Sequence, residues 1–154
     1  MRRRTRGSEL ADLREPGGYT AWPHVCAQHP HFYTLGLSAK ALLFEFLGQY
    51  RPGRNNGDLM CAYSVLHAKG WKSKGTVQRA RDELLRTGWI VVTRYGSLGI
   101  TELYALTFLA IDECGGKIVE YQINGKILGY WKTGSNPDYK SKRTKAQTVT
   151  ALAS

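Results

Sequence analysis

The stretch that decides the fold is "GWKSKGTVQRARDELLRTGWIVVTR", residues 70–94. Ser73 can cap a helix, because its side chain can accept a hydrogen bond from the first turn. Apolar residues then recur at the spacing of a helix that buries one face: Val77, Ala80, Leu84 and Leu85. Gly88 is expected to end this helix, and "WIVVTR" follows at once as a strand candidate rich in β-branched residues. The stretch therefore predicts a helix over 73–87 that turns directly into a strand.

The same stretch carries an excess of positive charge. Residues 69–94 hold seven Lys and Arg against two acids, within a chain whose net charge is +10. Basic segments flank it at both ends, with a charge of +3 over residues 1–14 and +4 over residues 132–154. This distribution favours a polyanionic partner, and basic tails that only aid solubility are the alternative.

Further segments complete the expected order of elements. Ser38 is expected to begin a helix with an apolar stripe that includes Phe44, and the turn "RPGRNNG" follows it. Asp58 is expected to cap a second helix that ends near Gly70. The strand candidates "WIVVTR" and "LYALTFLA" are joined by "YGSLGITE", which predicts a β-hairpin. Residues 19–111 therefore predict an α+β winged helix-turn-helix domain, with a three-helix core and a β-hairpin wing.

The remaining segments are expected to lie outside this domain. Residues 1–18 are interpreted as a basic, disordered N-terminal arm, and residues 133–154 as a basic, flexible tail. Between them, "KIVEYQINGKILGYW" contains Asn124 and Gly125 between two apolar runs, which is the pattern of a two-residue hairpin loop. A C-terminal β-hairpin is therefore predicted within residues 112–132.

The helix over 73–87 is the expected recognition helix, because an α-helix fits the major groove of DNA. Gln suits adenine and Arg suits guanine, a glycine lets the backbone approach closely, and the positive end of a helix favours a phosphate. The expected DNA contacts are Lys72, Ser73, Lys74, Gly75, Thr76, Gln78 and Arg79 on the helix, with Arg94, Tyr95 and Ser97 on the wing.

The segment "HVCAQHPH" is the main candidate for a metal site, with His24, Cys26, His29 and His31 as ligands. Four ligands within eight residues are closer together than the paired spacing of zinc sites, and Pro30 restricts how the chain could wrap around an ion. The chain contains no nucleotide-binding or hydrolase motif, and no third group is identified that would orient a Cys-His pair. The sequence therefore predicts no metal, no cofactor and no enzymatic activity.

The cysteine content and the hydropathy of the chain indicate the cellular compartment in which it is expected. The three cysteines are few, odd in number and widely spaced, which argues against a disulfide framework. No apolar run reaches the roughly 18 residues of a membrane helix. The basic N-terminus is not followed by an apolar region, so it does not resemble a secretory signal. These features predict a cytoplasmic protein with no membrane partner.

Several motifs resemble those of a bacterial and phage-associated family of winged helix-turn-helix domain proteins. They are the pair Pro23-His24, then "LSAKALL", "QYRPGRNNGDL", "SKGTVQRARDELLRTGWIVVTR" and "LYALTFL", in the order of the family over about residues 19–111. The third-helix pattern is shared by many winged-helix families, whereas its combination with "GRNNGDL" is more specific. The chain departs from the family at Arg81, where an aliphatic residue is usual, and in its aromatic segment after residue 117.

The resemblance implies a winged-helix fold and contact with DNA, and family members are mostly described only as DNA-binding proteins of mobile elements. The leading hypothesis is a sequence-specific double-stranded-DNA-binding protein that regulates transcription in a phage or other mobile element. A replication initiator or accessory factor with the same fold is the nearest alternative. A winged-helix module that binds a protein partner through residues 117–131 is an alternative of another class. RNA binding and a homodimer also stay open.

Overall fold

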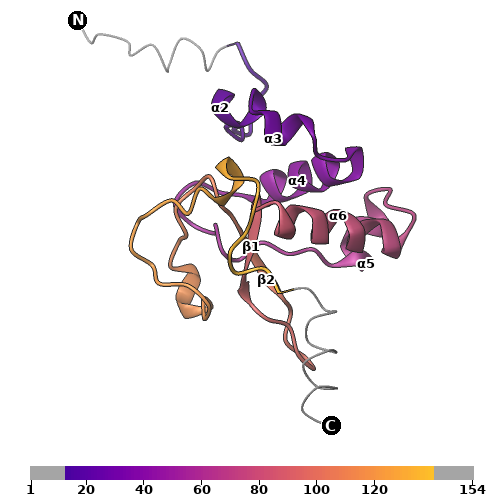
Figure 1. Cartoon of the computed structure of the whole chain (residues 1–154). Coiled ribbons are helices and arrows are strands. Elements are labelled where there is room, and N and C mark those ends of the chain that lie inside the picture. The colour runs from indigo at the N-terminus through magenta and orange to yellow at the C-terminus, as the bar shows by residue number, and fades with distance from the viewer. Residues whose placement is uncertain (1–12, 141–154) are drawn as a thin grey trace, which may run out of the picture.

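The computed structural model describes residues 13–140 of the 154-residue chain and has an α+β architecture (Figure 1). Its helices are α2 (His24–Ala27), α3 (Pro30–Tyr33), α4 (Leu37–Gln49), α5 (Tyr63–Ala68) and α6 (Lys74–Arg86). After them come β1 (Ile90–Arg94), β2 (Leu103–Leu106) and two short 3-10 turns, η1 (Cys114–Gly116) and η2 (Tyr130–Lys132). β1 and β2 form an antiparallel hairpin, so the predicted succession of three helices and a hairpin is confirmed over α4 to β2.

α6 packs against α4 with the orientation that its apolar spacing predicts. The residues predicted to face inward are all buried: Val77, Ala80, Leu84 and Leu85. Arg79 is exposed, as predicted. Gly88 follows the helix at φ +82°, and a Cβ atom there would lie 2.8 Å from the backbone of Tyr130. Glycine is therefore required at this position both by the left-handed backbone and by the close approach of the later chain.

α4 begins one residue earlier than predicted and is not capped by Ser38. Gly36 occupies the capping position, so Ser38 lies inside the helix. The N–H of Gly36 donates to Oε1 of Glu83, on α6, at 2.8 Å. A side chain from another helix therefore binds the start of α4 in place of a local cap. Phe44, which was expected in the apolar stripe, is 76% exposed and lies outside the core.

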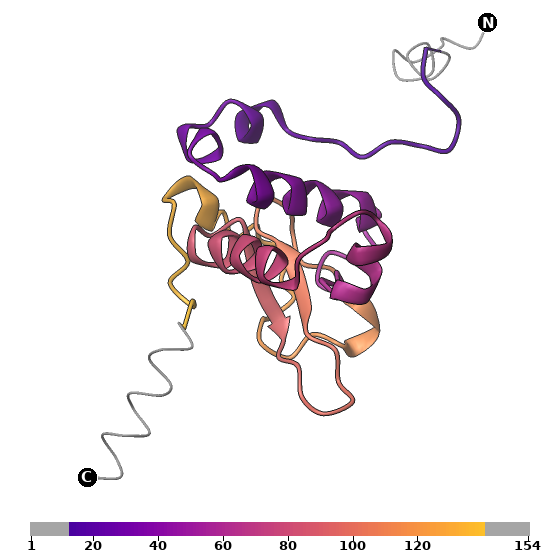
Figure 2. The ribbon, with the colours of Figure 1, turned by 90° about the vertical axis from the view of Figure 1, so that its right-hand side faces the viewer.

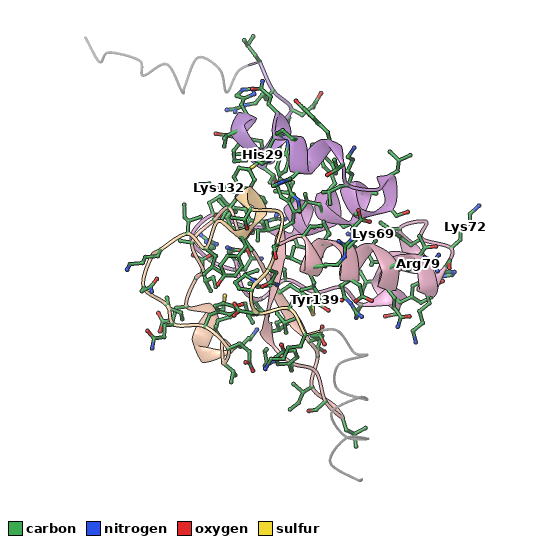
Figure 3. The ribbon with its side chains drawn as sticks, viewed as in Figure 1. His29, Lys69, Lys72, Arg79, Lys132 and Tyr139 are labelled. Atoms are coloured by element: carbon green, nitrogen blue, oxygen red, sulfur yellow. The ribbon has the colours of Figure 1, made fainter. Side chains whose placement is uncertain are left out.

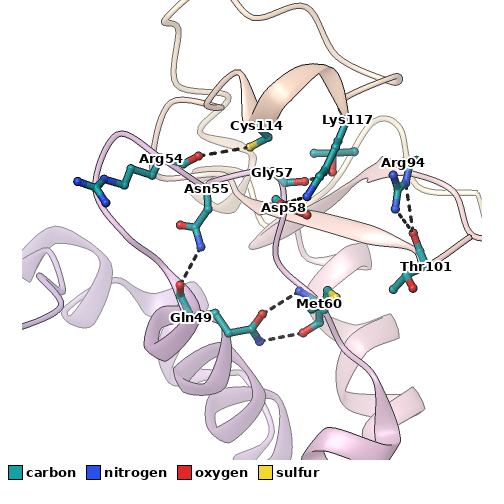
Figure 4. A network of polar contacts seen from close by, with 11 residues as sticks. Gln49, Arg54, Asn55, Gly57, Asp58, Met60, Arg94, Thr101, Cys114 and Lys117 are labelled. Atoms are coloured by element: carbon teal, nitrogen blue, oxygen red, sulfur yellow. Dashed lines mark hydrogen bonds and ion pairs between the residues drawn. The ribbon is translucent and has the colours of Figure 1, made fainter.

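The predicted cap of α5 by Asp58 is also wrong. α5 begins only at Tyr63, because the chain before it is extended: Leu59 and Tyr104 exchange backbone hydrogen bonds of 3.2 and 2.9 Å beside β2. The carboxylate of Asp58 instead pairs with the ammonium of Lys117 at 2.6 Å (Figure 4). The segment between the first two helices of the core is therefore joined to β2 by a single bridge.

Both faces of the β1–β2 hairpin are covered near its base, which explains why all four residues of β2 are buried. One face packs on the helices through residues such as Ile90 and Leu106. The other face is covered by the chain that follows β2, in a second apolar cluster of Val91, Ala105 and Ile111 packed against Ile118, Tyr121, Leu128 and Tyr130. In Figure 2 this later chain lies beside the hairpin, whose far end projects from the body.

The predicted C-terminal β-hairpin within 112–132 is wrong. The chain bends at Asn124 and Gly125, with Gly125 at φ +70°, but the apolar runs on either side do not pair with each other. Ile127 instead forms an isolated bridge with Ala110. A two-stranded hairpin has little stability by itself, whereas the open face of β1–β2 offers the same apolar residues a surface on which to be buried.

Residues 127–139, here called the C-terminal strap, return to the helices. Trp131 is buried and stacks on Trp89, with ring centroids 5.2 Å apart. The N–H of Asn136 donates to the carbonyl of Arg86, at the end of α6, at 3.1 Å. The first part of the predicted flexible tail is therefore packed on the core.

Two parts of the predicted basic ends are not covered by this description. Residues 1–12 of the N-terminal arm and 141–154 of the tail lie outside the described residues. Within residues 13–140, no helix is long and apolar enough to cross a membrane.

Candidate nucleic-acid interface

The helix residues predicted to contact DNA lie together at the N-terminal end of α6 (Figure 3). Lys72, Ser73, Lys74, Gln78 and Arg79 are exposed, whereas Gly75 and Thr76 are half-buried. Because the opposite side of α6 is packed against α4, this outward side is the face that α6 offers to a partner.

The start of α6 has the form of an anion-binding helix end. Ser73 has extended backbone angles, and its Oγ accepts a hydrogen bond from the N–H of Thr76 at 3.3 Å, which confirms the predicted cap. The hydroxyl of Ser73 keeps its own hydrogen available as a donor. The N–H groups of the first turn have no carbonyl partners within the helix, and they carry its partial positive charge. A phosphate oxygen would therefore be stabilised here.

Arg79 lies back over the first turn of α6. Its Nη2 donates to Oγ1 of Thr76 at 3.2 Å. A Cβ atom on Gly75 would lie only 3.3 Å from Nη1 of Arg79. The absence of a side chain at Gly75 thus leaves room for the guanidinium group, which sits close to the positive end of the helix. This is a reason for Gly75 that the sequence reading did not supply.

Two basic residues of the stretch 69–94 form ion pairs with acidic side chains of the same protein. Lys69 pairs with Glu45 of α4 at 2.8 Å. Arg81 pairs with Asp82 at 3.1 Å, and its side chain is only 17% exposed. The guanidinium of Arg81 is therefore accommodated by a neighbouring carboxylate, and both Lys69 and Arg81 have an acidic partner within the protein.

Three exposed cations without an ion pair lie together at the start of α6, whereas Arg86, also exposed, lies at its other end. Among the described residues, Lys72, Lys74 and Arg79 form no ion pair. All three are exposed, and they lie within one and a half turns of the capped helix start. Positive charge is thus concentrated where the helix end already favours an anion.

The hairpin residues predicted to contact DNA have different surroundings. Arg94 is half-buried, and its Nε and Nη2 both donate to the carbonyl of Thr101, at 3.3 and 3.0 Å (Figure 4). This arrangement fixes the guanidinium across the two strands. Ser97 is exposed and takes part in the turn at the hairpin tip, where its backbone N–H and carbonyl bond to Ile100 at 3.0 and 2.9 Å.

Tyr95 lies on the acidic side of the hairpin. Partial burial raises the pKa of its phenol, and the nearby carboxylates of Glu120, Glu102 and Asp138 raise it further. Carboxylates repel phosphates, so this position is the least suited of the predicted contacts to the DNA backbone. The structure therefore brings the helix residues together and separates Tyr95 from them.

Two apolar residues at the hairpin tip were not among the contacts predicted from the sequence. Leu98 is fully exposed at 103%, and Ile100 is 49% exposed. In the sequence, a leucine beside a turn glycine indicates an exposed apolar residue, because turn positions more often hold polar residues.

The cysteine thiols are protonated, and His31 contacts the backbone of the C-terminal strap. Burial raises the pKa of Cys26, Cys61 and Cys114 to about 11, so these thiols are protonated at neutral pH. The Nδ1 atom of His31 lies 3.0 Å from the carbonyl oxygen of Trp131, in the C-terminal strap. Across residues 13–140, no three His, Cys, Asp or Glu side chains are placed to hold a metal ion.

No protein-family model, curated protein or solved structure matches this chain.

Proposed function

We propose that this chain is a winged helix-turn-helix protein that binds double-stranded DNA, with α6 as the recognition helix and the β1–β2 hairpin as the wing. The order of α4, α5, α6, β1 and β2 supports this class, as does the extended segment at Leu59 that pairs beside β2. The observation that carries the proposal is the cluster of exposed, unpaired cations at the capped start of α6, formed by Lys72, Lys74 and Arg79. An α-helix fits the width of the major groove, and the positive charge of this face is complementary to the negative charge of the phosphates.

We further propose that binding is sequence-specific and serves transcriptional regulation in a phage or other mobile element. Gln78 and Arg79 support specificity, because both side chains are exposed one turn into α6, where they can reach base edges. Lys72 precedes the helix, where the DNA backbone would run. This division separates residues that read bases from residues that contact phosphates.

A second candidate is binding of a protein partner through residues 117–131. In that segment Val119, Ile123 and Ile127 are 70%, 46% and 58% exposed, although their neighbours pack on the sheet. Such a partner is compatible with DNA binding, because these residues belong to the chain that covers the face of the hairpin opposite the helices.

DNA affinity is expected to fall steeply with salt. If about four to six phosphates are neutralised, the logarithm of the association constant should fall against the logarithm of salt concentration with a slope of roughly −4 to −5. Fluorescence anisotropy of a labelled duplex over a series of salt concentrations measures this slope. Affinity that does not change with salt would rule out nucleic acid as the principal partner.

Substitutions in α6 are expected to separate reading of bases from electrostatic attachment. Arg79→Ala and Gln78→Ala should each cost about 1–3 kcal/mol on the preferred sequence and much less on scrambled DNA. Lys72→Ala should weaken both duplexes by similar factors, because a phosphate contact carries no sequence information. The measurement is a paired titration at fixed salt, against the duplex that the wild-type protein enriches from a random library and against its scrambled form.

Arg86→Ala is the matched control for these variants. It removes one exposed positive charge from the same helix, but at the end farthest from the capped start. Its effect on both duplexes should be smaller than that of Lys72→Ala. If Arg79→Ala and Gln78→Ala lower both affinities by the same factor as Lys72→Ala, α6 acts only as an electrostatic anchor and the regulator proposal fails.

A further inference from the structure

The tip of the β1–β2 hairpin is a closed turn. The backbone groups of Ser97 and Ile100 exchange two hydrogen bonds, of 3.0 and 2.9 Å, around Leu98 and Gly99. Gly99 has φ +74°, a backbone conformation that glycine adopts without strain. The position of Leu98 is therefore set by a defined turn.

The two arms behind the tip are held close together. A Cβ atom on Gly96 would lie 3.2 Å from both the backbone nitrogen and the Cβ of Glu102, on the opposite arm. Arg94 bonds across the arms to the carbonyl of Thr101. The hairpin thus carries its tip away from the body of the protein, as Figure 2 shows for the segment between β1 and β2.

Leu98 contributes nothing to the core, because its side chain is 103% exposed. Ile100, beside it, is 49% exposed, and residues 95–101 contain no charged side chain. A serine, asparagine or lysine at position 98 would suit a solvent-exposed turn better. The apolar tip is therefore available to a partner that offers an apolar surface.

We propose that Leu98 is a wedge that enters the minor groove of the DNA held by α6 and partly unstacks one base step. This inference rests on the proposed function. Phosphates flank the narrow minor groove, while its floor consists of base edges and sugars, so a neutral, apolar tip fits the floor better than the rim. Lys72 and Lys74, which form no ion pair and would attract phosphates, lie instead at the start of α6. The start of α6 would contact the DNA backbone, and the hairpin tip would contact the floor of the minor groove.

A wedge of this kind has a mechanical consequence. Side chains that insert between base pairs bend the duplex by about 20–90°, and flexible pyrimidine–purine steps are the least costly to open. Leu98 would therefore contribute to sequence preference at a step where it makes no base-specific hydrogen bond. It would act as a specificity-determining residue in addition to those on α6.

The test measures bending and affinity separately. The probe is the duplex enriched by wild-type protein from a random library, labelled at its ends for energy transfer and carrying 2-aminopurine at successive steps. Wild-type protein should shorten the end-to-end distance and raise 2-aminopurine fluorescence at one step. Leu98→Ala should lose most of both signals and weaken binding by roughly tenfold, because the lost contact is apolar. It should leave the salt slope unchanged. Leu98→Phe should retain the bend.

Val25→Ala is the control, since it truncates an exposed aliphatic side chain (61%) on α2, away from the hairpin and from the start of α6. It should bend DNA as the wild-type protein does. If the wild-type complex is straight, or if Leu98→Ala binds and bends as the wild-type protein does, the wedge is refuted while DNA binding stands. If the wild-type protein enriches no sequence and its affinity is insensitive to salt, the proposed function fails and the wedge fails with it.

Discussion

Asn56→Ala is expected to lower the free energy of unfolding by about 3 kcal/mol or more. The Asn56 side chain is completely buried. Its Nδ2 donates to the carbonyls of Leu106, Leu109 and Ala110 at 3.0, 3.2 and 2.9 Å, and its Oδ1 accepts from the N–H of Leu106 at 2.8 Å. Alanine would leave these buried backbone groups without their partner, at a cost of about 1–3 kcal/mol for each unsatisfied group.

Urea unfolding followed by tryptophan fluorescence measures this loss. Asn55→Ala is the matched control, because Asn55 is only half-buried, although its Oδ1 also accepts a backbone hydrogen bond, from Arg51 at 2.6 Å. Its expected cost is about 1 kcal/mol. Asn56→Asp should be as damaging as Asn56→Ala, since it would place a carboxylate against three carbonyl oxygens. Equal losses for Asn55→Ala and Asn56→Ala would contradict the central role of Asn56.

The importance of Asn56 extends to the proposed wing. The backbone N–H of Asn56 donates to Oδ2 of Asp112 at 2.8 Å, and the N–H of Asp112 donates to the backbone carbonyl of Asn56 at 2.8 Å. Asn56 thus joins the loop before α5 to the end of β2 and to the chain beyond. The relative position of the helices and the hairpin, on which a two-element DNA interface depends, is held through this residue.

Trp131→Ala is expected to cost about 3–5 kcal/mol, the range for truncating a large buried aromatic residue. The Trp131 ring stacks on Trp89 at a centroid distance of 5.2 Å and meets His29 edge-on at 5.0 Å. It is the main apolar anchor that holds the C-terminal strap against α2, α3 and the core. Its loss would leave a cavity among residues from three separate parts of the chain.

Trp131→Phe separates packing from polarity. Among the described residues, the indole N–H of Trp131 has no hydrogen-bond partner. Phenylalanine removes that unsatisfied group while keeping an aromatic ring, so its cost should be well below that of Trp131→Ala. Tyr33→Ala, which truncates an aromatic residue that is 60% exposed, should change stability by less than about 0.5 kcal/mol. A loss below about 1 kcal/mol for Trp131→Ala would show that the strap is not part of the cooperative core.

Local signals were sufficient to predict α6 and its outward face. The cap at Ser73 and the inward residues Val77, Ala80 and Leu84 agree with the structure. Capping and apolar spacing act over a few residues, and they leave one helix orientation in which the apolar side is buried. The exposure of Arg79 and Gln78 follows from the same orientation, so this half of the candidate interface could be predicted.

The starts of α4 and α5 were decided at longer range. Ser38 and Asp58 are suitable caps by residue type, but the N–H of Gly36 is bound by Glu83 and the carboxylate of Asp58 by Lys117. Each partner lies more than forty residues away in sequence. A local cap is worth only about 1 kcal/mol, so a contact from a distant element can replace it.

The chain after β2 depended most on tertiary structure. Asn124 and Gly125 favour a hairpin locally, yet the apolar residues around them have a larger surface available on the open face of β1–β2. Their burial there also places carboxylates beside Tyr95 and leaves the hairpin tip at Leu98 uncovered. Burial of apolar area depends on which surfaces the completed fold leaves open, and residue spacing along the chain carries no information about those surfaces.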